Sequence, residues 1–222
     1  DKTGVETADI EDLIVGNAFP EGEQGFNIAR MAVFLAGLPD RVPGMTVNRW
    51  CASSMMAIQI AAGNIALGAG EAYLCAGVES MTRVPMGGFN PLPSPDLMET
   101  RPEAYMGMGE TAENLARKYQ IPRERQDEFA LASQHKTRAA MTAGHFDDEI
   151  VPITTPDGRV IDTDGTPRPD TTLEGLAGLD PSFDAQGTVT PGTSSPLTDG
   201  AAACLVCSRE YAERHGLPIY AR

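Results

Sequence analysis

The stretch between residues 55 and 67 constrains this chain most, because its only large polar side chains are Gln59 and Asn64. A helix that is apolar on every side must lie inside a folded structure. Three short apolar runs read as strands, and a longer amphipathic run between the first two reads as a helix. In chain order, these four runs lie at 11–18, 25–39, 45–48 and 71–80. Strands that alternate with helices are typical of an α/β domain, so we predict a parallel sheet with a buried central helix.

The sequence changes character after residue 83. Residues 84–109 are rich in Pro, Gly and Met, which predicts a long irregular excursion, and two helices follow it. Pro122 at the start of the second helix and Gly144 at its end are the expected boundary residues. A strand at 187–195 and a buried strand at 201–208 return the chain to the core. We therefore predict an α/β core, 1–83 with 187–222, interrupted by an inserted domain, 84–186.

The charge balance excludes some partners. The formal net charge is −14 and the sequence pI is near 4.5. A surface this acidic repels nucleic acid and anionic membranes, whereas an anionic small molecule needs only a local basic patch. We find no basic-then-apolar signal segment, and the longest apolar runs are too short to cross a bilayer.

The four cysteines predict reduced thiols rather than a disulfide framework, and hence a cytoplasmic protein. Cys204 and Cys207 form a C-x-x-C pattern, but it lies within an apolar run without a second C-x-x-C or a nearby histidine. We interpret this pattern as part of a buried strand and predict no metal site.

Cys51 lies between a predicted strand and the apolar helix. This junction falls at the carboxyl end of a parallel sheet, where ligands bind in open α/β folds. The partial positive charge of a helix N-terminus favours a thiolate by up to ~2 kcal/mol, so full activation needs an additional base. The alternative is a cysteine that acts as a small core hydrophobe, and position alone leaves both interpretations open.

Four segments resemble the thiolases, the acyl-CoA:acetyl-CoA C-acyltransferases, in the right order and over almost the whole chain. They are "GFNIARMAVFLAGLP", "TVNRWCASSMMAIQIAAGNIALGAGEAYLCAGVESMTRVPM", "MGMGETAENLARKYQIPRERQDEFALASQHKTRAAMTAGHFDDEIVPI" and "FDAQGTVTPGTSSPLTDGAAACLV". The resemblance implies an N-terminal α/β domain with a mixed, mostly parallel sheet, and an inserted α+β loop domain that binds coenzyme A. It also implies a homodimer or homotetramer in the intact protein.

The resemblance makes Cys51 the acylated nucleophile, whose backbone N–H helps to stabilise the oxyanion. It places Ser195 against the pantetheine arm of coenzyme A and Arg168 against the adenine nucleotide end. It places Met108 and Phe183 along the pantetheine tunnel. By themselves, these four residues would be read as a loop serine, a solvated arginine and ordinary packing residues.

Two differences from the motifs of many biosynthetic thiolases indicate a closer resemblance to the degradative 3-ketoacyl-CoA thiolases. Gly107 stands where many biosynthetic thiolases have His, and "GTSS" stands where many have "GNAS". The implied reaction is attack of Cys51 on the 3-keto carbon, loss of acetyl-CoA and transfer of the acyl group to coenzyme A. The reverse reaction condenses two acetyl-CoA molecules. Coenzyme A is a substrate here, and no metal or organic cofactor is implied.

Two catalytic motifs of the family, "GHP" with its histidine and "CxGGG" with a second cysteine, do not occur in these 222 residues. His135, His145 and His215 read as surface or capping residues. We therefore expect a fragment without the C-terminal catalytic half, which on its own is inactive. We also expect it to lack a first strand from the middle of the sheet, which would leave two rows of unpaired backbone groups.

Two other functions stay open. The first is a different condensing enzyme of the superfamily, such as a ketosynthase, although the long insertion argues against it. The second is a non-catalytic module that binds acyl-CoA or lipid.

Overall fold

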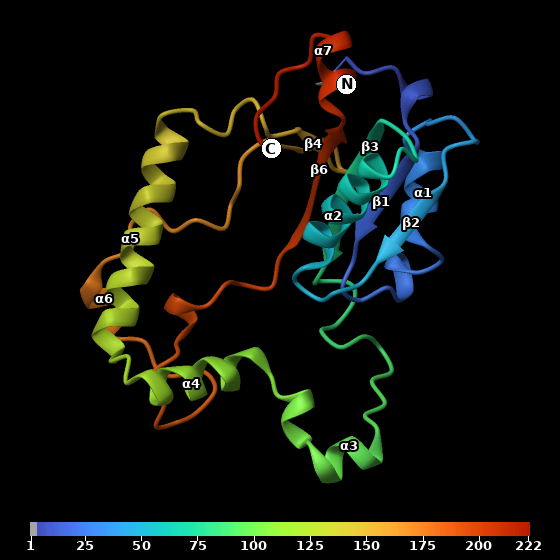
Figure 1. The fold of residues 1–222 in the computed structure, drawn as a ribbon. Helices are drawn as coiled ribbons and strands as arrows, with labels where there is room; N and C mark the ends of the chain where they lie inside the picture. The colour runs from blue at the N-terminus through green and yellow to red at the C-terminus, as the bar shows by residue number, and fades with distance from the viewer. Residues whose placement is uncertain (1–3) are drawn as a thin grey trace. The chain divides into compact units, whose positions relative to one another are not determined.

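The computed structural model describes residues 4–222 and divides into two compact units (Figure 1). Unit 1 comprises Asp1–Leu92 and Leu197–Arg222, and unit 2 comprises Pro93–Pro196. These boundaries differ by nine to ten residues from the 84–186 insertion expected from sequence texture.

Hydrogen bonds explain both shifts. Val84 is buried, and Phe89 N donates to Glu21 Oε2 at 2.7 Å, so the beginning of the irregular excursion belongs to unit 1. At the other boundary, Thr188 N and Val189 N donate to the buried carboxyl group of Glu113. Because a carboxyl group holds this backbone, residues 187–195 form no strand, contrary to the sequence prediction.

Unit 1 is built on a four-stranded sheet in the order β2-β1-β3-β6. The strands are β1 (Asp12–Gly16), β2 (Gly44–Val47), β3 (Ala72–Ser80) and β6 (Asp199–Cys207). β1 pairs in parallel with β2 and β3, and β6 pairs antiparallel with β3. The predicted mixed, mostly parallel sheet is confirmed.

The sheet has no central gap. Leu13 is paired with Gly44 of β2 on one side and with Leu74 of β3 on the other. This register continues along β1, so the expected rows of unpaired backbone groups in the middle of the sheet are not found in the described residues. β6 lies at an edge, and its residues 199–204 are exposed, so the C-x-x-C strand is not the buried strand that its apolar composition predicted.

Alternate residues of β1 enter two separate clusters, because successive side chains of a strand point to opposite faces. Leu13 and Val15 pack with Ala29 and Val33 of α1 (Ile28–Leu35). Ile14 packs on the other face with Ala57 and Ala61 of α2 (Ser53–Ala66), together with Tyr73 and Cys75 of β3.

Only one face of α2 is covered. Ser53, Ala57 and Ala61 are buried, whereas Met55 and Ile58 are 55% and 41% exposed. The expected burial of this helix on every side is therefore not met within the part of the chain that the structure describes. The apolar composition of α2 exceeds what its contacts with the sheet need.

The remaining elements of unit 1 are short. They are η1 (Thr7–Asp9), η2 (Gly22–Gln24) and α7 (Arg209–Arg214).

Unit 2 is mostly helical, with one two-stranded ribbon. Its elements are α3 (Pro95–Thr100), η3 (Pro102–Tyr105), α4 (Met108–Tyr119), α5 (Arg123–Thr142), β4 (Ile153–Thr154), β5 (Val160–Ile161), α6 (Leu173–Ala177) and η4 (Pro191–Thr193). Arg123 at the start of α5 pairs with Asp127 and donates to the carbonyls of Leu176 and Leu179. These bonds hold the short helix α6 against α5.

No helix within residues 4–222 combines the length and apolar character that a bilayer crossing requires. Within the same residues, no group of three or more His, Cys, Asp and Glu side chains could hold a metal ion.

Candidate active site at Cys51

Cys51 is exposed and lies between the end of β2 and the first residue of α2. β1, β2 and β3 are parallel, so this junction falls at the carboxyl edge of the sheet, as the sequence predicted. Met56 N donates to Ala52 O, which closes the first turn of the helix directly after the cysteine. The thiol is therefore held at the beginning of a fourteen-residue helix.

The residue before Cys51 has an unusual backbone. Trp50 has φ of +48°, in the left-handed region that a bulky residue rarely adopts. Ser53 secures this turn, because its Oγ accepts from Arg49 N at 2.8 Å and donates to Trp50 O. Ser53 N also donates to Trp50 O. A small, buried serine thus fixes the turn that presents the thiol.

Two glycines let α2 begin close to the sheet. A Cβ at Gly16 of β1 would lie 2.3 Å from Ser54 N, and one at Gly77 of β3 would lie 2.0 Å from Ser54 Oγ. Both distances are shorter than any real contact of a side-chain carbon. The absence of side chains at these two positions therefore allows the start of α2, directly after Cys51, to lie close against β1 and β3.

The other three thiols are less suited to nucleophilic attack. Cys75 is buried, and burial raises its pKa to about 12. Desolvation by neighbouring groups also raises the pKa of Cys204, although its side chain is exposed, and that of half-buried Cys207 on β6. A thiol with a raised pKa holds little thiolate at neutral pH.

Two predicted tunnel residues lie near the start of α4 in unit 2. Met108 is the first residue of this helix and is 67% exposed. The ring of Phe183 lies against Gly109, where a Cβ would come within 2.2 Å of its Cδ1. Phe183 also lines a cavity of about 510 Å³ with Met106 and Asn114. The structure thus brings Phe183 to the residue next to Met108.

The other two predicted contacts of coenzyme A lie in loops of unit 2. Arg168 N donates to Gln134 Oε1 of α5 at 2.8 Å. Ser195 is exposed just beyond η4, and the neighbouring Ser194 Oγ donates to Thr190 O at 2.8 Å. The loops that carry both residues are anchored by hydrogen bonds, while the roles of the side chains stay predictions.

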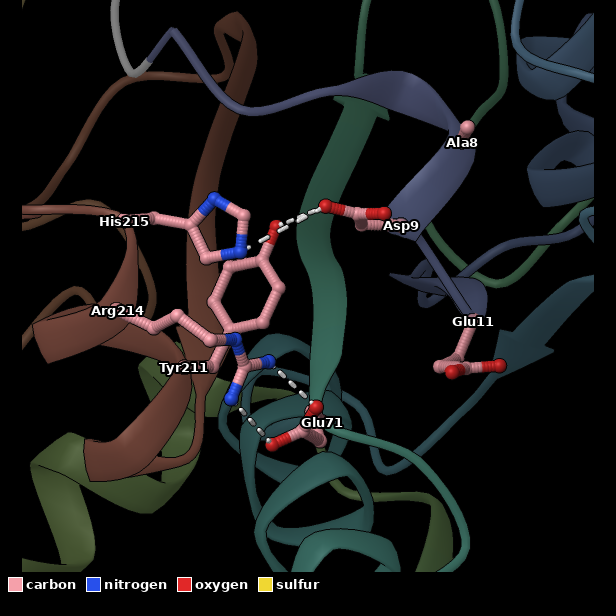
Figure 2. Close-up of a pocket in the computed structure, with 7 residues that line it drawn as sticks. All are labelled: Ala8, Asp9, Glu11, Glu71, Tyr211, Arg214 and His215. Atoms are coloured by element: carbon pink, nitrogen blue, oxygen red, sulfur yellow. Dashed lines mark hydrogen bonds and ion pairs between the residues drawn. The ribbon is translucent and has the colours of Figure 1, made fainter.

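The three histidines lie away from Cys51 in the sequence and at the surface, as predicted. His135 is exposed in the middle of α5 and His145 just after it. His215 stacks on Tyr211 in a cavity of about 350 Å³ in unit 1. There Tyr211 donates to Asp9, and Arg214 pairs with Glu71 (Figure 2). The cavity is bordered by a hydrogen bond that α7 makes with η1 and by an ion pair that α7 makes with the residue before β3.

An exposed cysteine between a parallel strand and a helix, at the carboxyl edge of the sheet, places the chain among the α/β proteins with a ligand site at that edge. The sequence matches the family "Thiolase, N-terminal domain" over residues 1–210. The chain belongs to the thiolase family, and the resemblance found in the sequence is confirmed.

Two kinds of relative are found among curated proteins. The chain is 45% identical to a 3-ketoacyl-CoA thiolase of Bacillus subtilis, with 97% of this chain and 58% of the relative covered. It is 40% identical to an acetyl-CoA acetyltransferase of Rhizobium meliloti, with 100% and 60% covered. The chain therefore spans somewhat more than half of the length of the relatives it matches.

Solved structures show the same fold. The dimeric peroxisomal thiolase of Saccharomyces cerevisiae matches with a TM-score of 0.89 and 36% identity, over 96% of this chain and 55% of that one. Human mitochondrial 3-ketoacyl-CoA thiolase in complex with CoA matches with a TM-score of 0.84 and 33% identity, over 98% and 58%. The predicted thiolase-like fold is confirmed.

Proposed function

We propose that this chain supplies the nucleophile of a 3-ketoacyl-CoA thiolase. The Cys51 thiolate forms a bond to the 3-keto carbon of the substrate, and the bond between C2 and C3 then breaks. Its electron pair leaves with C2, which takes up a proton as acetyl-CoA. The thiolate of free coenzyme A then attacks the acyl-Cys51 thioester, giving a shortened acyl-CoA and restoring the Cys51 thiolate.

The position of Cys51 carries this proposal. An exposed thiol at the start of a helix, at the carboxyl edge of a parallel sheet, has access to a substrate and a local field that favours its anion. A ketosynthase-like enzyme is disfavoured by the family match, which includes the insertion. Gly107 and the "GTSS" loop favour cleavage, the chain-shortening step of fatty acid β-oxidation, over condensation.

Coenzyme A binding belongs to the same proposal. Arg168 and Ser195 would contact its nucleotide end and its pantetheine arm, and Met108 and Phe183 would line the path of that arm. The cavity beside Phe183 also carries Glu110, Glu113, Arg117 and Asp184, so it is mostly polar, and this assignment rests on the family resemblance. The human relative was solved with CoA bound.

We propose, further, that the whole protein is a dimer in the cytoplasm. β2 is an edge strand, and exposed apolar side chains lie on it and on the neighbouring helix α1. They are Met31, Phe34, Leu35 and Met45. An edge strand with exposed apolar neighbours is a surface suited to pairing with a second copy. The yeast relative is a dimer.

Incubation of the whole protein, including the C-terminal half that this chain lacks relative to its relatives, with acetyl-CoA tests the proposed chemistry. We expect an acetyl group on Cys51, detected by peptide mass, which free coenzyme A then removes. Cys51→Ser should abolish the rapid labelling, whereas the matched variant Cys207→Ser should keep it. Saturable binding of acetyl-CoA without modification of Cys51 would instead indicate the non-catalytic acyl-CoA-binding module and would contradict the proposed nucleophile.

A further inference from the structure

Glu79, near the end of β3, organises the loop that follows β1. One of its carboxyl oxygens accepts from Ala18 N at 2.7 Å, and the other accepts from Gln24 Nε2 at 2.8 Å and from Asn17 Nδ2 at 3.2 Å. Asn17 and Gln24 are almost fully buried, at 1% and 2% exposure. Several donors on one carboxyl group fix the loop in a single conformation.

This loop in turn holds the turn that precedes Cys51. Asn48 Nδ2 donates to Ala18 O at 2.9 Å, and Asn48 Oδ1 accepts from Trp50 N at 2.9 Å. The ring of Phe19 meets the ring of Trp50 at a centroid distance of 5.5 Å. Asn48 therefore connects the loop ordered by Glu79 to the left-handed residue next to the nucleophile.

A bulky residue keeps a left-handed backbone only where its surroundings enforce it. Trp50 is 62% exposed, so burial of its side chain does not provide that constraint. The constraint comes from its backbone bonds to Asn48 and Ser53 and from the Phe19 ring. Without Asn48, Trp50 N loses its acceptor and the turn loses its connection to Ala18.

We infer that Glu79 and Asn48 are positioning residues for Cys51, acting in series through Ala18. This inference rests on the proposed role of Cys51 as the nucleophile. Neither side chain needs to touch the substrate. Their effect is to keep the thiol at the N-terminal end of α2, where the helix field favours its reactive form.

Alkylation by iodoacetamide tests the inference without any recognition of coenzyme A. The rate at Cys51 is measured by peptide mass relative to the rate at Cys207 in the same molecules. We expect Asn48→Ala to lower the alkylation rate of Cys51 about tenfold. This corresponds to loss of most of the stabilisation that the helix N-terminus gives the thiolate. Asn48→Asp keeps the acceptor for Trp50 N but loses the donor to Ala18 O, so it should restore only part of the rate. Glu79→Gln should slow Cys51 by about threefold, since one oxygen acceptor remains.

The matched control is Asp199→Asn. Asp199 also accepts from a backbone N–H and a hydroxyl group, those of Thr82, but it has no bond to the nucleophile turn. We expect this variant to react at the wild-type rate. General loosening would raise labelling of Cys207 and buried Cys75, and only a selective loss at Cys51 supports positioning.

The experiments distinguish failure of the positioning inference from failure of the proposed function. A wild-type rate at Cys51 in a folded Asn48→Ala variant would overturn the positioning inference and leave the proposed function intact. Absence of acetylation by acetyl-CoA in the whole protein, with the alkylation differences present, would overturn the proposed function alone. Asn48 is exposed, so its variants should fold, and circular dichroism checks this.

Discussion

The two units of this chain are stabilised in different ways. Unit 1 places a four-stranded sheet between apolar side chains from α1 and α2, and side chains of β1 contribute to the apolar cluster on each face. Unit 2 has one ribbon of two strands, each two residues long, and few buried apolar residues, of which Leu176 and Val189 are examples. Its long loops are held instead by carboxyl groups, since Glu113 and Asp127 are 2% and 3% exposed.

The difference has a functional meaning. A nucleophile must be held in one place, and a sheet edge with close helix contacts provides that rigidity. Three of the four proposed contacts with coenzyme A, Arg168, Phe183 and Ser195, lie on loops, whose position depends on a few polar bonds. We therefore expect packing substitutions to affect unit 1 most and carboxyl substitutions to affect unit 2 most.

The largest expected effect is that of Gly16→Val. Any side chain here would overlap the backbone of Ser53 and Ser54, so α2 must move away from the sheet. We expect a loss of about 4 kcal/mol or more in the free energy of unfolding, which is exceptional for one substitution. Hydrogen exchange should show loss of protection in β1 and α2.

Gly63→Ala is the matched control in the same helix. No atom lies within 4 Å of a Cβ at Gly63, so alanine meets no obstacle there. We expect a gain of about 0.5–1 kcal/mol, from the better helix propensity of alanine. Equal stability of Gly16→Val and wild type would show that close packing of α2 does not hold unit 1.

The next effect tests unit 2. Glu113→Ala removes the acceptor of Thr188 N and Val189 N and leaves both N–H groups without this partner. We expect a loss of about 3 kcal/mol, because several hydrogen bonds to one charged group fail together. Glu113→Gln keeps one acceptor oxygen and should lose about 1 kcal/mol. Hydrogen exchange over residues 187–195 measures the local opening.

Glu110 provides a control one turn away on α4. It is exposed and accepts only from Gly107 N at 3.2 Å. Glu110→Ala should therefore cost about 0.5 kcal/mol, as loss of a helix cap does at an exposed position. Equal effects of Glu113→Ala and Glu110→Ala would contradict the view that a buried carboxyl group holds this part of unit 2.

The sequence alone predicted much of unit 1 and less of unit 2. Apolar runs located β1, β2 and β3, because buried strands and helices impose short-range patterns. Their order in the sheet could not be predicted this way, since an apolar run does not say which neighbour it pairs with. The same limit explains β6, whose apolar composition fits an edge strand as well as a buried one.

The residues around Cys51 were also predicted only in part from the sequence. Cys51 was found through its junction and its resemblance to a family. Glu79 and Asn48 were missed, because their partners lie far away in the sequence. The only local signal was a polar residue at the end of each predicted strand. Val189 looked like part of a strand until the structure showed that Glu113, on α4, accepts its N–H.

The smallest predicted effect concerns a polar contact in unit 1, where we expect apolar packing to contribute more to stability than polar contacts do. Tyr211 of α7 is 3% exposed and donates to Asp9 Oδ2 at 2.9 Å. Tyr211→Phe removes this hydrogen bond while keeping the ring, so we expect a loss of about 1 kcal/mol at neutral pH by chemical denaturation. A loss as large as that of Glu113→Ala would erase the distinction between the two units.

The pH dependence of stability of Tyr211→Phe, compared with that of the wild type, tests the contribution of this hydroxyl group to unit 1. Burial, with help from Asp9, raises the pKa of Tyr211 to about 12, above the ordinary value of 10. A raised pKa in the folded state stabilises the protein fully below pH 10, and this contribution disappears as the pH rises toward 12. Burial also raises the pKa of Tyr73 and raises that of Cys75 to about 12, so these groups add to the loss of stability of the wild-type protein in this window. Tyr211→Phe should retain the decline due to these other groups and lose the part due to Tyr211, and an unchanged slope above pH 10 would show that Tyr211 does not stabilise the folded state through its hydroxyl group.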